Sequence, residues 1–132
     1  FDESQMDWRP MEGVRSVGEL FLHVAGANYR LVGMLGGKPP AGMSFDGWEQ
    51  STTDKAEIVA KLKASFAHLS KVIDGIDPSK ADEPRQVVGR DNTNRGALWT
   101  ITEHLSEHLG QSIAYARSNK VVPPWTAARA NR

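Results

Sequence analysis

Two histidines on one side of a predicted helix are the residues of this chain best suited to bind a metal ion. His104 and His108 are four positions apart, so on an α-helix their side chains lie about 40° apart and one turn from each other. Two imidazoles in that arrangement can reach the same ion, although most such pairs are accidents of a helix surface or core. The chain has no cysteine, so any metal must be held by nitrogen and oxygen.

A column of polar side chains continues from this pair. His104, His108, Gln111 and Tyr115 follow Ala97 along one side of the predicted helix, at the edge of its apolar stripe. Gln111 and Tyr115 can hydrogen-bond a metal-bound water or a ligand, which makes them candidate catalytic residues that orient a nucleophile. The alternative is a polar seam that only packs and hydrogen-bonds between helices.

His23 is the candidate third ligand. It lies at the apolar edge of another predicted helix, where a lone histidine is more often a satisfied boundary residue. Placed opposite His104 and His108, it completes a three-nitrogen site with an open position, typical of a divalent metal that activates water or a thiol. Arg30, about two turns after His23, is a candidate to bind an anionic group of a substrate. His68 is predicted to face solvent and not to be a ligand.

The segment from His104 to His108 also spells H-x-x-E-H, the inverted zinc-peptidase motif. That motif needs an acidic third ligand well downstream, and no Asp or Glu follows His108. The peptidase interpretation is therefore rejected. Glu103 and Glu107 can support the outer nitrogen of a histidine, but exposed charges are the commoner case on a helix surface.

Three amphipathic helices are expected to position these residues. The first begins at the capping box of Ser16 and Glu19 and ends at Gly36-Gly37, the second begins near Thr53 or Asp54 and stops at Asp77-Pro78, and the third runs from Thr93 or Asn94 to about Ser118. The two connections are about sixteen residues long, enough to run back along a helix, so neighbouring helices can be parallel. Val87-Val88 is too isolated to found a sheet, and the predicted fold class is all-α.

Three such helices close a bundle poorly. We therefore expect a fourth helix, preceding Phe1, or a second chain that supplies the missing surface.

Composition restricts the remaining classes. The chain has 132 residues, typical of one domain, and 16 basic residues balance 16 acidic ones. No basic face alternates with stacking aromatics, so no nucleic-acid partner is expected. No apolar run is long enough for a membrane span, and the absence of cysteine is compatible with a cytoplasmic location.

Several segments together resemble the DinB-like family of metal-binding four-helix bundles, over nearly the whole chain. They are Trp8-Arg9-Pro10, Val14 to Glu19 leading to His23, Ala25 to Tyr29, His104 to Gln111 with Tyr115, Arg117 and Asn119, and Val122 to Trp125. The resemblance implies an up-down-down-up bundle, often a homodimer, whose first helix would precede Phe1. It also implies that His23, His104 and His108 are the metal ligands.

Characterised members of that family include enzymes that use low-molecular-weight thiols, as S-transferases or as a thiol-dependent isomerase. The leading hypothesis is therefore a divalent-metal enzyme acting on a small-molecule substrate with such a thiol, and hydrolysis by activated water is the second. A stress-linked binding or scaffold protein with a vestigial or structural site is the non-enzymatic alternative. Three imidazoles suit zinc, nickel, iron or copper. The segment around Trp125 can cover a bundle end or reach a partner subunit, although plain packing is the commoner case for such a segment.

Overall fold

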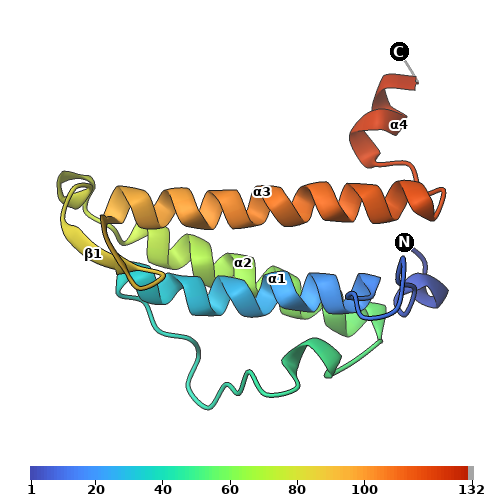
Figure 1. Ribbon diagram of the computed structural model, residues 1–132, viewed down its shortest axis with the longest axis horizontal. Coiled ribbons are helices and arrows are strands. Elements are labelled where there is room, and N and C mark those ends of the chain that lie inside the picture. The colour runs from blue at the N-terminus through green and yellow to red at the C-terminus, as the bar shows by residue number, and fades with distance from the viewer. Residues whose placement is uncertain (131–132) are drawn as a thin grey trace.

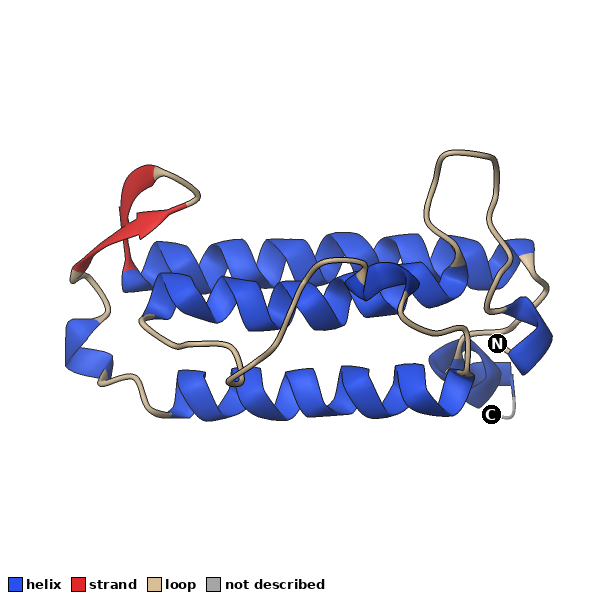
Figure 2. Ribbon diagram, turned by 90° about the horizontal axis from the view of Figure 1, so that it is seen from below, coloured by secondary structure: helices blue, strands red, loops and turns tan. Residues whose placement is uncertain are grey.

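The computed structural model describes residues 1–130 and is mostly helical, with one small two-stranded sheet (Figure 2). The long helices are α1 (Val17–Leu31), α2 (Lys55–Asp74) and α3 (Asn94–Ser118), and α4 (Pro124–Ala130) is short. The strands are β1 (Pro84–Val87) and β2 (Arg90–Thr93), and the 3₁₀ turns are η1 (Glu3–Gln5), η2 (Val32–Leu35), η3 (Trp48–Gln50) and η4 (Pro78–Lys80). None of the described helices is both long enough and apolar enough to cross a membrane.

The predicted helix starts are confirmed by their caps. The Ser16 hydroxyl accepts from the Glu19 amide at 3.2 Å, and the Glu19 carboxylate accepts from the Ser16 amide at 2.7 Å. Thr93 caps α3 in the same way, since its hydroxyl accepts from the Gly96 amide at 3.2 Å. These bonds satisfy amides that have no partner within the helix.

The first long connection joins two parallel helices, as its length allows, whereas the second joins two antiparallel ones. In Figure 1, α1 and α2 run in the same direction and α3 runs back against them. The segment 36–54 makes the parallel arrangement possible, because it returns along α1 before α2 begins. Its turn η3 packs on α1, where Trp48 Nε1 donates to the Leu22 carbonyl at 2.8 Å. Gly26 leaves room for that ring, since a Cβ there would lie 2.9 Å from Trp48 Cδ1.

The second connection corrects the prediction that no sheet forms. Strands β1 and β2 pair antiparallel, with Val87 opposite Arg90. Val88 and Gly89 form the tight turn between them, and both have positive φ, 51° and 74°. Such a turn matches the right-handed twist of paired strands, so Val88 is a turn residue and not part of a strand.

The core has two clusters, one toward each end of α1, which packs against both α2 and α3. The first cluster contains Met6, Val17, Leu20, Leu22, Ile58 and Tyr115, and the second contains Val32, Leu35, Leu69, Val87, Ala97 and Ile101. The stretches of α1 and α3 that carry the candidate histidines lie between these clusters. Both helices are therefore anchored on either side of the candidate site.

One side of the helix assembly stays open. Leu20, Phe21 and Val24 of α1 line a groove of about 290 Å³ together with residues of α2 and α3. Phe66 and Leu109, expected in the core stripes of their helices, are 39% and 53% exposed here. The described residues supply three long helices, so the expected four-helix bundle is not confirmed.

Segment 121–125 leads from α3 into α4 at one end of the assembly. It borders a cavity of about 250 Å³ together with Phe1 and Phe21, and Trp125 remains 46% exposed. Trp125 therefore packs beside the end of α3 and leaves nearly half of its surface exposed.

Candidate metal centre

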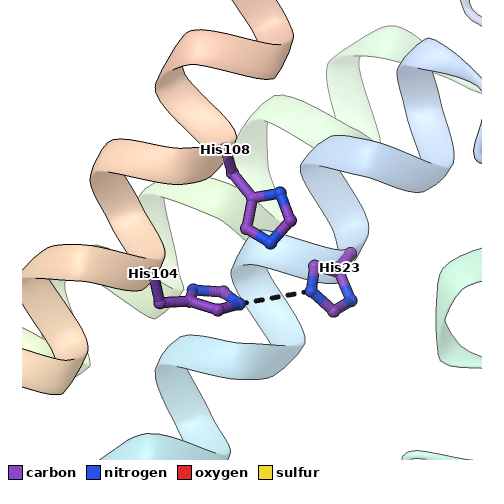
Figure 3. A group of neighbouring side chains, drawn as sticks. All are labelled: His23, His104 and His108. Atoms are coloured by element: carbon purple, nitrogen blue, oxygen red, sulfur yellow. Dashed lines mark hydrogen bonds between the residues drawn. The ribbon is translucent and has the colours of Figure 1, made fainter.

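Three histidines from two antiparallel helices come together in the middle of the molecule. His23 is on α1, and His104 and His108 are on consecutive turns of α3. Each offers a ring nitrogen, and the three nitrogens lie within 4.8 Å of one another. Figure 3 shows the rings converging, with one nitrogen of His108 directed into the gap between the other two rings. The Nε2 atoms of His23 and His104 are 3.2 Å apart.

The outer nitrogen of His23 is held by a carboxylate that the sequence analysis missed. Glu49, in η3, accepts from His23 Nδ1 at 2.6 Å. Arg15 donates two hydrogen bonds to the same carboxylate, at 2.6 and 3.1 Å. Because an ionised carboxylate only accepts hydrogen bonds, Nδ1 of His23 carries the proton. The lone pair of Nε2 therefore faces the other two histidines.

A chain of hydrogen bonds sets His108 in the same way. Tyr115 donates from its hydroxyl to the Arg15 carbonyl at 3.0 Å, and Gln111 donates from its amide to the Tyr115 hydroxyl at 3.3 Å. Because the Arg15 carbonyl can only accept, the Tyr115 hydroxyl must donate to it and can accept the bond from Gln111. The Gln111 oxygen then faces His108 Nδ1 at 2.9 Å and accepts its proton. The Nε2 lone pair of His108 is left for the centre of the cluster.

These contacts differ from the nucleophile-orienting role expected of Gln111 and Tyr115. Tyr115 is 93% buried, and its ring packs edge-on against Trp8 at 5.4 Å between centroids. Its hydroxyl is bonded to the Arg15 carbonyl and to the Gln111 amide. In this geometry the two residues fix the ring of His108.

His104 is the least supported of the three rings. Its Nδ1 atom is buried without a hydrogen-bond partner. Burial, followed by the neighbouring His108 and His23, lowers the pKa of His104 to about 4. The imidazole is therefore neutral at pH 7, which is the form that binds metal ions.

Burial and hydrogen bonding together set the charge states of His23 and Glu49. It lowers the pKa of the His23 imidazole despite the hydrogen bond to Glu49, so this ring too favours its neutral form. Burial alone would raise the pKa of Glu49, but the hydrogen bonds from Arg15 and His23 outweigh it and the pKa lies below its ordinary value. The carboxylate thus stays ionised and holds a neutral imidazole by its N–H.

The remaining candidates lie outside the cluster. His68, on α2, donates from Nε2 to the Lys38 carbonyl at 2.9 Å, and its ring lies beside Tyr29. Glu103 and Glu107 are exposed on α3, and Glu49 occupies the position beside a histidine that was considered for them. Arg30 lies in a cavity that it shares with His23.

The residues present fit a divalent metal ion. Two nitrogens bound to one tetrahedral zinc ion are about 3.3 Å apart, given Zn–N bonds of about 2.0–2.1 Å. The 3.2 Å between the Nε2 atoms of His23 and His104 is close to that spacing. Outer hydrogen bonds of the kind that Glu49 and Gln111 make to His23 and His108 are typical of metal-binding histidines.

The family comparison agrees with this architecture. The model of the DinB superfamily matches residues 1–112. The chain belongs to the DinB superfamily. All three histidines of the cluster, as well as Glu49 and Gln111, lie within the matched region of this DinB chain. The search of curated proteins found no match.

Replacing Glu49 by glutamine tests the support of His23. We expect metal affinity to fall about 10–100-fold, because the amide holds the imidazole N–H less firmly and releases Arg15. Competition titration against a chromogenic chelator measures the affinity. Glu107→Gln is the matched control and should leave the metal affinity unchanged. If Glu107→Gln lowers the affinity and Glu49→Gln does not, the residue that supports a metal-binding histidine lies on α3.

Proposed function

We propose that this protein binds a divalent metal ion through His23, His104 and His108 and uses it in a transferase-like reaction between a low-molecular-weight thiol and a small electrophilic substrate. The observation that carries the proposal is the convergence of three imidazole nitrogens within 4.8 Å of one another. Three protein ligands leave a coordination position for a reactant, as in catalytic metal sites. An ion bound there would lower the pKa of a thiol or water that joins it and so supply a nucleophile near pH 7.

The protein's own residues would orient the histidines of the site. Glu49 and Gln111 hold the outer nitrogens of His23 and His108, at 2.6 and 2.9 Å. On its other side His108 lines the open apolar groove, together with Leu105 and Leu109. In the transfer, a C–S bond forms to the electrophilic carbon, the leaving group departs with the bonding electrons, and the thiol proton passes to solvent.

The test combines metal analysis with a conjugation assay. Purified protein is loaded with zinc, nickel or iron(II), and consumption of an electrophile such as monochlorobimane is followed with and without cysteine. We expect product only with both metal and thiol, and loss of product after chelation.

Two other outcomes assign a different function. Turnover of a nitrophenyl ester without thiol would establish hydrolysis by activated water, the second enzymatic candidate. Stoichiometric metal without either reaction would leave a structural or binding role.

A further inference from the structure

A polar cavity of about 150 Å³ lies next to the histidine cluster, between α1 and the segment 45–50. His23 forms one end of its lining, and Arg30 lies on the same face of α1, seven residues further on. Phe45, Trp48 and Glu49 contribute the opposite wall. The cavity therefore connects the candidate metal centre to an arginine along one helix face.

Arg30 carries the only uncommitted charge of this lining. Its guanidinium lies over the Phe45 ring, 4.4 Å from the centroid. Within residues 1–130, none of the carboxylates lies within salt-bridge distance of it. Stacking on an aromatic ring leaves the edge of a guanidinium free to donate hydrogen bonds.

The acidic residue of the cavity does not offset Arg30. Glu49 is bound to Arg15 through two hydrogen bonds and to His23 through a third. Its charge is thus matched locally, and a divalent ion at the histidines would add further positive charge. A ligand of this cavity should be anionic, and a carboxylate suits the planar fork of arginine.

The spacing limits the size of that ligand. Seven residues of an α-helix span about 10 Å, and arginine side chains on helices lean toward the N-terminus, here toward His23. A volume of about 150 Å³ is below that of sites for whole drug-sized ligands, which begin near 300 Å³. The cavity therefore suits an arm of a substrate and not a complete large molecule.

We propose that this cavity binds the carboxylate arm of the thiol substrate, with Arg30 as the residue that recognises the carboxylate. The inference rests on the proposed thiol-dependent function. It names the substrate class as thiols that carry a carboxylate less than about 10 Å from the sulfur.

Thiol binding tests the proposal without relying on activity. Cobalt(II)-loaded protein is titrated with 6-mercaptohexanoate and with 6-mercaptohexanol, and the sulfur-to-cobalt absorption band is followed. We expect wild type to bind the carboxylate about tenfold more tightly than the alcohol. Arg30→Gln should abolish that preference and keep the affinity for the alcohol. Arg90→Gln, a change of the same charge on the exposed hairpin, should behave as wild type. The proposal is overturned if the ratio of the affinities for the carboxylate and the alcohol is the same in wild type and in Arg30→Gln.

A second titration separates this site from the thiol chemistry. Metal-free protein is titrated with hexanoate and with hexanol, and NMR signals of the Arg30 Nε–H and the Trp48 indole N–H are followed. A Trp48 shift with hexanoate that is absent in Arg30→Gln supports the carboxylate site even where no thiol binds cobalt, in which case the proposed function alone fails. Thiol binding without any hexanoate shift rejects the carboxylate site and leaves the proposed function standing.

Discussion

Replacing His104 by alanine should weaken divalent metal binding by about a hundredfold or more. Structural zinc sites with four ligands bind with about 10–16 kcal/mol, so one ligand is worth roughly 3 kcal/mol, which is about two orders of magnitude in affinity. The loss should be at least this large here because, within residues 1–130, the cluster supplies three protein nitrogens and not four ligands. Competition titration with a chelator of known affinity measures the effect.

His68→Ala is the matched control for this variant. It removes an imidazole that donates to the Lys38 carbonyl and lies outside the cluster. We expect it to retain wild-type affinity and a metal content of one ion per chain. If both variants lose metal equally, or neither does, then the ion is not held by the cluster.

The histidine cluster could be predicted from the sequence because helical periodicity is a strong signal. His104 and His108 share a face of α3 by their spacing alone. His23 lies in a helix whose capping box and apolar stripe define its inward side. The approach of α1 and α3 follows from burying those stripes, which brings the three rings to one place.

The hydrogen-bond partner that holds His23 could not be predicted from the sequence in the same way. Glu49 lies in the 36–54 segment, whose path over α1 is not set by any periodicity. It is placed by Trp48, which donates to the Leu22 carbonyl and packs against Gly26. A close approach of this kind depends on three-dimensional contacts, so spacing along the chain did not distinguish Glu49 from Glu103 or Glu107.

The hairpin and the open groove mark two other limits of pattern analysis. Val87-Val88 read as an isolated apolar pair, whereas Val88-Gly89 is the turn that pairs β1 with β2. Phe66 and Leu109 follow helical stripes correctly, but a stripe shows only that a face is apolar. What covers that face depends on the neighbouring elements, and among the described residues this side of α2 and α3 remains open.

Metal removal should lower the thermal stability of the protein substantially. An ion held by His23 of α1 and by His104 and His108 of α3 joins two helices that separate on unfolding, so it binds the folded state preferentially. At a free metal concentration one thousand times the dissociation constant, this linkage stabilises the folded state by about 4 kcal/mol. For a domain of this length we expect the unfolding temperature to rise by about 10–20 °C over the chelated protein.

The His104→Ala variant makes this second prediction quantitative. With affinity reduced about a hundredfold, the same metal concentration is only about ten times the dissociation constant, and the stabilisation falls to about 1.4 kcal/mol. Differential scanning calorimetry of wild type and variant, each with metal and with chelator, should therefore show a shift in the variant about one third of that in wild type. Equal shifts would mean that the ion binds elsewhere on the folded chain, because a site that includes His104 must lose stabilisation in step with its affinity.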